Sequence, residues 1–244
     1  MHLNANGTVA YFSMDVAVEP NIPTYSGGLG ILAGDTLRSA ADLGIPMVGL
    51  TLLNRKGYLE QHLDNAGNQS ESSASWSPET ILEPLPARVS VAVEGREVRI
   101  RAWQYSIRGV NGHVVPLLFL DTNLADNDPE DRALTDHLFG GDERYRLCQE
   151  VVLGFGGVAM LHALGFSTVG VYHMNEGHAA LVPLALLELR AEGELLDAVQ
   201  DGILHAVRGQ CVFTTHTPVP AGHDRFPLDL ATRVLGEHRI AALH

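Results

Sequence analysis

Short runs of apolar residues recur along the chain, and each is long enough for one buried β-strand. They occupy residues 9–14, 47–53, 168–174 and 211–215. Unbroken apolar character over so few residues is typical of strands that are covered on both faces, as in parallel sheets. We therefore expect a parallel β-sheet at the centre of the fold.

The segments between these runs show the apolar spacing of helices. Apolar side chains recur at helical intervals over residues 31–43, and Gly44 provides a stop. Further helices are expected over residues 143–164, from just after residue 178 to about Leu189, and over residues 194–207. Strand, helix and strand in succession predict a right-handed βαβ unit.

The period of the apolar pattern changes to two further along. Apolar residues alternate with small or polar ones over residues 89–102, interrupted by a turn at residues 94–95. This alternation predicts a β-hairpin, with a third strand over residues 114–120. We expect these strands, at about residues 87–120, to form either a small antiparallel insertion or an edge extension of the main sheet. Residues 54–86 are polar and irregular and are expected to be loops.

A glycine-rich segment, residues 25–30 (YSGGLG), leads directly into the first predicted helix. Glycine has no Cβ atom, so its backbone can take positive φ values and a ligand can approach closely. The unpaired N–H groups and the positive dipole at the start of a helix favour an anion. A phosphate or a sugar oxygen is the natural ligand for such a segment.

The residues of this loop leave three interpretations open. A P-loop needs Gly-Lys-Ser/Thr after its glycines, whereas residues 31–32 are apolar here. Gly28, Gly30 and Ala33 match a dinucleotide fingerprint, and Arg55 could meet a 2′-phosphate, but the preceding strand ends about a dozen residues too early. The third interpretation is a tight loop that binds nothing.

Composition narrows the class of ligand. The chain has 244 residues, 45% of them hydrophobic, and a formal net charge of −13. This length fits one large core, or one domain with a small lobe. The acidic surface argues against nucleic acid and anionic membranes, and no apolar run reaches membrane-spanning length. A neutral carbohydrate is compatible with this charge, whereas an anionic substrate needs local hydrogen-bond donors.

The cysteines argue for a reducing compartment. Cys148 and Cys211 lie far apart in apolar stretches. We expect buried free thiols and a cytoplasmic location. No spacing of cysteine and histidine resembles a zinc site, so no metal is expected.

Polar residues follow two of the predicted parallel strands. Asn175, Glu176 and His178 stand between one strand and a helix, and His216 follows the next strand. Ligands of open parallel sheets bind at the carboxyl ends of the strands, so these side chains should share one edge with the glycine loop. Each also has a structural explanation, as a hydrogen-bonded histidine or as an acid that satisfies a helix dipole. Together they favour a carbohydrate that carries a phosphate or is attacked by one, and no flanking carboxylate pair favours a hydrolase.

Four motifs in this order resemble the α-glucan (glycogen or maltodextrin) phosphorylase family, above all its bacterial branch. They lie at residues 9–14 (VAYFSM), 25–35 (YSGGLGILAGD), 173–180 (HMNEGHAA) and 213–223 (FTTHTPVPAGH). The likeness extends from about residue 9 to about residue 227. Glycogen synthases share a similar glycine loop but not the last two motifs.

The resemblance implies an α/β fold: a Rossmann-like parallel sheet with helices on both faces and a small antiparallel β insertion. This is the N-terminal half of a two-domain GT-B type glycosyltransferase. Members of the family cleave α-1,4-glucans with phosphate and release glucose 1-phosphate. Their cofactor is pyridoxal phosphate, whose 5′-phosphate acts on the substrate phosphate. By resemblance, the phosphate-binding positions are Gly27, Gly28 and Leu29, and the substrate-binding positions are Asn175, Glu176, His178 and His216, with Glu176 replacing the family's aspartate.

The chain departs from the family in one respect. The cofactor lysine and the basic residues around both phosphates belong to the family's second domain, and Lys56, in a polar turn, is the only lysine here. We therefore expect residues 1–244 to form the N-terminal domain alone, without the C-terminal cofactor domain, and to be inactive and unable to bind pyridoxal phosphate in isolation. An excised segment, a truncated gene and one part of a split protein all fit this expectation. The face meant for the second domain would favour self-association, so a homo-oligomer is compatible with it.

Two other functions stay open. One is a sugar-nucleotide-dependent glycosyltransferase of the glycogen-synthase type, because its donor nucleotide would also lie mainly on the other half. The other is a non-catalytic glucan-binding module, which predicts that the isolated chain binds glucan as well as any longer form does.

Overall fold

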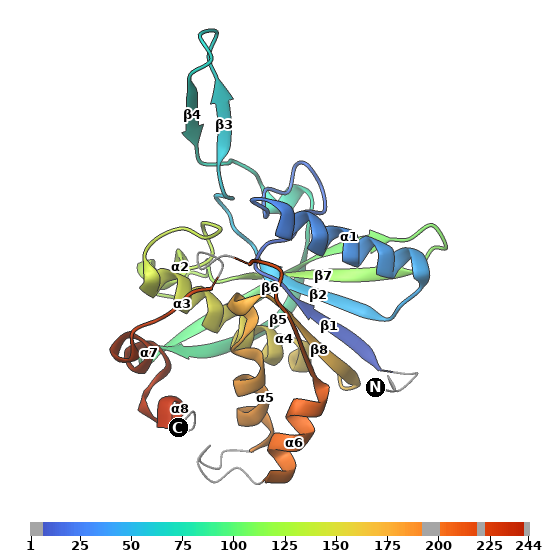
Figure 1. The fold of residues 1–244 in the computed structure, drawn as a ribbon, viewed down its shortest axis with the longest axis vertical. Coiled ribbons are helices and arrows are strands. Elements are labelled where there is room, and N and C mark those ends of the chain that lie inside the picture. Colours follow the sequence, from blue (N-terminus) through green and yellow to red (C-terminus); the bar gives the residue numbers. More distant parts are fainter. Residues whose placement is uncertain (1–6, 192–200, 219–222, 242–244) are drawn as a thin grey trace.

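The computed structural model describes residues 7–191, 201–218 and 223–241 of the chain. A seven-stranded sheet in the order β5-β6-β7-β2-β1-β8-β9 forms its centre (Figure 1). The strands are β1 (Thr8–Phe12), β2 (Met47–Leu52), β5 (Glu83–Val93), β6 (Arg96–Arg108), β7 (Val114–Asp121), β8 (Val169–Asn175) and β9 (Cys211–Thr214). Every predicted apolar run is a strand of this sheet.

The sheet has a parallel part and an antiparallel part. Neighbouring strands from β7 through β2, β1 and β8 to β9 are parallel. The pairs β5–β6 and β6–β7 are antiparallel. The turn between β5 and β6 lies at Glu94 and Gly95, both with positive φ, as a two-residue hairpin turn requires. Because β7 pairs with β2, the alternating segment is an edge extension of the main sheet.

Helices cover both faces of this sheet, as expected for the Rossmann-like class. The helices are α1 (Gly28–Leu43), α2 (Pro129–Arg132), α3 (Glu143–Val151), α4 (Gly157–Ala163), α5 (Val182–Arg190), α6 (Asp201–Gln210), α7 (Leu228–Leu235) and α8 (Glu237–Ala241). Alternate residues of β1 show the two layers. Tyr11 enters the core with Leu37 of α1, whereas Phe12 enters the core with Val151 of α3 and Val158 of α4.

The helix predicted over residues 143–164 is interrupted by a π-helical turn at Val152–Gly156. The predicted start is confirmed, because the Asp142 side chain accepts a hydrogen bond from the Tyr145 backbone N–H at 2.9 Å. A Cβ atom on Gly156 would lie 2.5 Å from Ile100, and one on Gly157 would lie 2.7 Å from Phe12. These glycines let the helix pack closely on the sheet.

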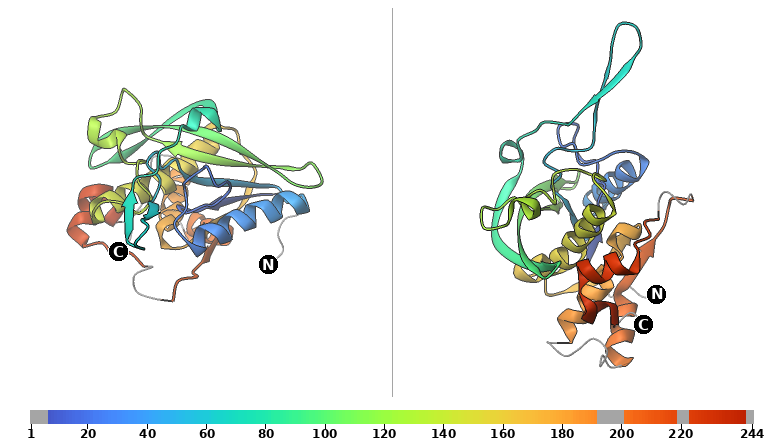
Figure 2. Two further views of the ribbon diagram at one scale, coloured as in Figure 1. Left: turned by 90° about the horizontal axis from the view of Figure 1, so that it is seen from above. Right: turned by 90° about the vertical axis from the view of Figure 1, so that its left-hand side faces the viewer.

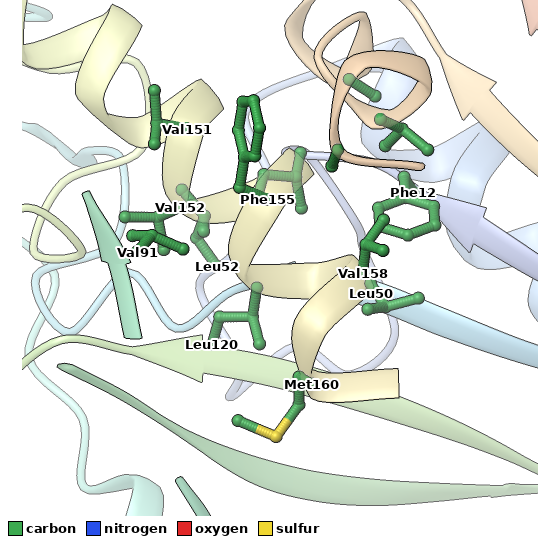
Figure 3. Packing of buried hydrophobic residues seen from close by; sticks show 14 of the residues in the cluster. Phe12, Leu50, Leu52, Val91, Leu120, Val151, Val152, Phe155, Val158 and Met160 are labelled. Atoms are coloured by element: carbon green, nitrogen blue, oxygen red, sulfur yellow. The ribbon is translucent and has the colours of Figure 1, made fainter. Parts of the chain in front are cut away.

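Figure 3 shows side chains of this helix gathered with Leu50 and Leu52 of β2 and Leu120 of β7. Glycine lowers helix propensity by up to about 1 kcal/mol per residue relative to alanine. The close packing offsets that effect and explains why a glycine-rich segment remains helical.

Two expectations were wrong. Residues 54–86 contain a second sheet, the antiparallel pair β3 (Glu60–Leu63) and β4 (Gln69–Ser72). This hairpin projects away from the rest of the chain (Figure 2). Every residue of both strands is exposed, so no apolar alternation marks them in the sequence. In addition, α1 begins at Gly28 and not at residue 31, and the helix predicted from residue 194 lies partly outside the described residues.

A buried carboxylate joins the segment after β2 to the antiparallel edge. Asp121, at the end of β7, is fully buried. It accepts hydrogen bonds from Arg55 at 2.7 Å, Arg101 at 2.8 Å and the Trp103 indole at 2.9 Å. Burial alone would raise the pKa of Asp121, but the hydrogen bonds and the positive charge of Arg55 outweigh burial and hold the pKa below its usual value.

Substituting Asp121→Ala should lower the free energy of unfolding by about 3 kcal/mol, because it leaves two guanidinium groups without their shared anion. Asp126→Ala is the matched control, since its ion pair with Arg99 is half-exposed or more and should contribute less than about 1 kcal/mol. Urea denaturation measures both. Equal effects of the two substitutions would contradict the assignment of Asp121 as a structural anchor.

The same cluster predicts a pH dependence. Because the pKa of Asp121 is lowered on folding, its contribution to the free energy of unfolding is complete above the unfolded pKa of about 4. That contribution should be lost as the pH falls through the lowered folded value. The gap in stability between wild type and Asp121→Ala should therefore narrow only below about pH 4.

Candidate functional site

A cavity of about 340 Å³ lies at the carboxyl edge of the parallel strands. The segments that follow β1, β8 and β9 contribute to it, together with the first turn of α1. One side is formed by Ser26, Gly27, Gly28 and Leu29, and the other by Glu176, His178 and Thr217. The structure therefore brings most of the predicted site residues to one place.

Three other hollows among the described residues are larger than this cavity, and the smallest of them, of about 390 Å³, is lined by residues at the starts of α3 and α7. Another, of about 430 Å³, lies between the glycine segment and the base of the β3–β4 hairpin, where Tyr25, Tyr58 and Trp76 line it. The third, of about 570 Å³, is mainly apolar and is lined by residues of α5, α6 and β9. We assign the candidate site to the 340 Å³ cavity because it holds both the helix start and the strand-end side chains.

The glycine side of the cavity is the start of a helix. Gly27 is the N-cap of α1, so Gly28 and Leu29 belong to its first turn, whose N–H groups have no partner within the helix. A Cβ atom on Gly27 or Gly28 would meet no described atom within 4 Å. The space beside these amides is therefore open to a ligand.

The expected positive φ values are absent from this turn: Gly27, Gly28 and Gly30 all lie outside the left-handed region. Glycine is required for a different reason. A Cβ atom on Gly30 would lie 2.2 Å from the Asp15 carboxylate, and one on Gly34 would lie 1.8 Å from the Ala17 carbonyl oxygen. Close approach of the segment after β1 therefore excludes side chains at Gly30 and Gly34.

The opposite side of the cavity is organised by Glu176, which is buried. Its carboxylate accepts hydrogen bonds from the backbone N–H groups of His216 and Thr217, the second at 2.8 Å, and from the Thr217 hydroxyl at 3.2 Å. Burial would raise the pKa of Glu176, but these hydrogen bonds hold it below its usual value. Glu176 has φ +70°, a conformation that costs a non-glycine residue about 1 kcal/mol or more. Its carboxylate thus holds the segment after β9 in place.

Asn175 and His216 lie beside the cavity and do not line it. Asn175 is fully buried. Its amide donates to the Ser13 hydroxyl at 3.1 Å, and its carbonyl oxygen lies 2.9 Å from Nε2 of His216. With the amide oriented in this way, His216 carries a proton on Nε2 and donates it. The exposed His216 ring is therefore fixed by the strand next to it.

His178 lines the cavity, and one nitrogen of its ring is unpaired. Its Nε2 atom is shielded from solvent and has no hydrogen-bond partner among the described residues. Burial lowers the pKa of His178 to about 4, although the nearby Glu176 carboxylate opposes the shift. The ring is therefore neutral at physiological pH, which suits a sugar hydroxyl.

Sequence reasoning missed other cavity residues, notably Asp15, Phe139, Arg146 and Asp224. Arg146 of α3 forms an ion pair with Asp224 at 3.1 Å, and its Nε atom has no partner in the described part of the chain. The strand-end rule, applied to the residues after β1, would have indicated Asp15. No sequence spacing points to Arg146, because α3 reaches the cavity only through the packing of the helix on the sheet.

Lys56 does not fit the role of a cofactor lysine. Its side chain is half-exposed, and its ammonium group lies 2.7 Å from the Asp136 carboxylate. A Schiff-base lysine needs burial or a neighbouring cation to make its amine reactive, and an ion pair with an acid has the opposite effect. The residues described here supply amides for a phosphate group but no such lysine.

Other features limit the chemistry. Within the described ranges, no three acidic, histidine or cysteine side chains are placed to hold a metal ion. No described helix has the length and apolar character needed to cross a bilayer. Both cysteines are free; Cys148 is buried as expected, whereas Cys211 is only partly buried.

The fold and the cavity define an α/β domain with a mostly parallel sheet and a candidate site at the carboxyl edge of that sheet. No protein-family model matches the chain. It is nevertheless similar in sequence to phosphorylases of α-glucans.

A glycogen phosphorylase of Mycobacterium tuberculosis is 40% identical over 243 residues, which cover 95% of this chain and 27% of the relative. A maltodextrin phosphorylase of Thermococcus litoralis is 41% identical over 90% of this chain and 26% of its own length. A glycogen phosphorylase of Aquifex aeolicus is 31% identical over 91% of this chain and 32% of the relative. The resemblance predicted from the motifs is confirmed, and the chain spans about a quarter to a third of these relatives.

Two glycine substitutions should separate ligand contact from packing. Gly28→Ala should leave the unfolding free energy unchanged or raise it by up to about 1 kcal/mol, because its Cβ enters open space in a helix. Gly30→Ala should lower it by about 1–3 kcal/mol, because its Cβ collides with Asp15. Thermal and urea unfolding check both, and a stable Gly30→Ala would contradict the packing described above.

The titration of His178 is a further expectation. Its pKa of about 4 in the fold lies below the unfolded value of about 6.5, so the unfolded state binds more protons between these values. Stability should therefore fall as the pH drops from about 6.5 to about 4, and His178→Gln should remove that part of the loss. Nuclear magnetic resonance of the imidazole measures the midpoint directly, and a midpoint near 6.5 would refute the neutral, buried histidine.

Proposed function

We propose that this chain forms the phosphate-binding and sugar-binding half of an α-glucan phosphorylase. The reaction is the cleavage of an α-1,4-glucan by inorganic phosphate to give glucose 1-phosphate. The observation that carries this proposal is the pairing, across one cavity, of open helix-start amides with the neutral side chain of His178. Similarity to glycogen and maltodextrin phosphorylases supports the same assignment.

Each side of the cavity has a separate part in this proposal. The first-turn amides of Gly28 and Leu29 donate hydrogen bonds to phosphate oxygens, aided by the helix dipole. His178 orients the hydroxyls of the transferred glucosyl unit, and the exposed His216 ring, whose Nε2 proton is already donated to Asn175, contacts that unit from beside the cavity. Glu176 does not need to touch the sugar, because its hydrogen bonds already fix the segment that carries His216 and Thr217.

Pyridoxal phosphate, which the family resemblance implies, would supply a 5′-phosphate beside the substrate phosphate. We place its lysine outside these 244 residues, because Lys56 is paired with an acid. The basic groups that neutralise both phosphates are placed there too. The free thiols support a cytoplasmic location, since they persist in reducing compartments.

The decisive assay uses the protein that the complete reading frame encodes. Maltodextrin cleavage should require inorganic phosphate and yield glucose 1-phosphate. Activity that needs a sugar nucleotide and ignores phosphate would replace the proposal with a glycogen-synthase type transferase. Glucan binding without turnover would favour a binding module.

Within that protein, Gly28→Ala should raise the KM for phosphate by about tenfold to a hundredfold, because the new methyl group displaces an oxygen from charge-assisted amide bonds. Gly209→Ala on α6 is the matched control, since its Cβ also enters space free of described atoms, away from the cavity. The KM for maltodextrin should change far less. An unchanged KM for phosphate in Gly28→Ala would exclude the helix start as the phosphate site.

A further inference from the structure

Asp15 is almost completely buried. It lies beneath residues 26–29, which we call the glycine turn. It follows β1 and is separated from the turn by a loop of the chain. One carboxylate oxygen accepts the backbone N–H of Ser26 at 3.0 Å, and the other lies 3.1 Å from the Ser26 hydroxyl. The carboxylate thus holds the residue immediately before the Gly27 N-cap.

The surrounding segment makes this contact specific. Gly30 must be a glycine because its Cβ would collide with Oδ1 of Asp15. The Ala17 backbone N–H donates to the Gly30 carbonyl oxygen at 2.9 Å, and the backbone N–H of Val16 donates to the Thr24 carbonyl oxygen at 2.9 Å. The Asp15 carboxylate therefore lies between Ser26 and the first turns of α1.

The charge of Asp15 is unfavourable at this place. In the described part of the chain, Asp15 forms no ion pair, and it lines the same cavity as the amides of the turn. Burial raises its pKa to about 6, and hydrogen bonds from Ser26 and Gly30 oppose the rise. A negative charge beside an anion site weakens anion binding, so a function for this carboxylate must lie in its hydrogen bonds.

We propose that Asp15 is the positioning residue of the anion site, and that its oxygens fix the turn at Ser26 so that the amides of Gly28 and Leu29 face the cavity. Its role is that of a hydrogen-bond acceptor and not of a charge. This inference rests on the proposed function for the identity of the anion, whereas the contacts of Asp15 with the turn do not depend on it.

Two substitutions of Asp15 separate these roles. Asn keeps one carbonyl oxygen for the Ser26 N–H, and its amide can donate to the Ser26 hydroxyl, so Asp15→Asn preserves the turn and removes the charge. Asp15→Ala removes both acceptors and releases the turn. A residue that served only the stability of the fold would not change the affinity for phosphate in folded variants.

The test uses the 244-residue chain, ¹⁵N-labelled, with inorganic phosphate as the probe. Without phosphate, the amide signals of Ser26 and Gly30 should shift together with pH, with a midpoint near 6, in the wild type and not in Asp15→Asn. Other charged groups at the cavity are Arg146, Glu176, His178 and Asp224. Spectra of His178→Gln exclude that ring as the source of the shift.

Phosphate titrations then measure affinity from the signals of Gly28 and Leu29. Asp15→Asn should bind phosphate at least as tightly as the wild type at pH 7, and Asp15→Ala at least about tenfold more weakly. The matched control is Asp42→Ala, which removes an aspartate–backbone bond to Val110 at the other end of α1 and should leave the affinity unchanged. Equal affinities of Asp15→Ala and the wild type would overturn the proposal, and so would a tenfold loss in Asp15→Asn.

The proposed function and the proposed role of Asp15 can fail separately. If no variant of the isolated chain binds phosphate, the KM of Gly28→Ala in the complete protein decides the phosphate site, and the amide titration alone decides whether Asp15 holds the turn. If Asp15→Ala does not fold, Asp15→Asn still decides the proposal, because loss of the turn's signals in that variant would overturn it. Phosphate binding that survives in Asp15→Asn, with the pH-dependent shift abolished, supports it.

Discussion

The close packing of the segment after β1 against α1 is the constraint on which the rest of the site depends. The Ala17 carbonyl oxygen approaches the helix so closely that only glycine fits at Gly34, and the Asp15 carboxylate does the same at Gly30. Side-chain volume is thus excluded from one face of the first turns of α1. The helix start is held at a fixed distance from the ends of β1 and β8, which places its free amides opposite His178.

Several carboxylates in this protein act as hydrogen-bond acceptors that tie one segment to another. Asp121 joins the loop after β2 to the antiparallel strands, and Glu176 holds the segment after β9. Glu94, at the β5–β6 turn, accepts from Arg144 of α3. Several of the buried acids are already paired or hydrogen-bonded. The net charge of −13 therefore does not determine the electrostatic potential in the cavity.

Much of the sheet could be predicted because central strands such as β1 and β2 are buried and leave unbroken apolar runs in the sequence. The strand-end rule then located Glu176 and His178. The β3–β4 hairpin could not be found in this way, because its residues are all exposed. The start of α1 and the contribution of Arg146 depend on distances between segments far apart in the sequence. Which glycines are required likewise followed from packing and not from the motif itself.

The two sides of the cavity are joined by an internal chain of hydrogen bonds. His216 donates to Asn175, whose amide donates to the Ser13 hydroxyl, which in turn donates to the backbone carbonyl oxygen of Asp15 at 2.8 Å. Asp15 then accepts from Ser26, at the entry to the glycine turn. The side proposed to bind sugar and the side proposed to bind phosphate are therefore connected through the buried ends of β1 and β8. Because Ser13, Asp15 and Asn175 are all buried, water cannot readily replace a lost partner, and breaking one of these hydrogen bonds leaves a buried polar group unpaired.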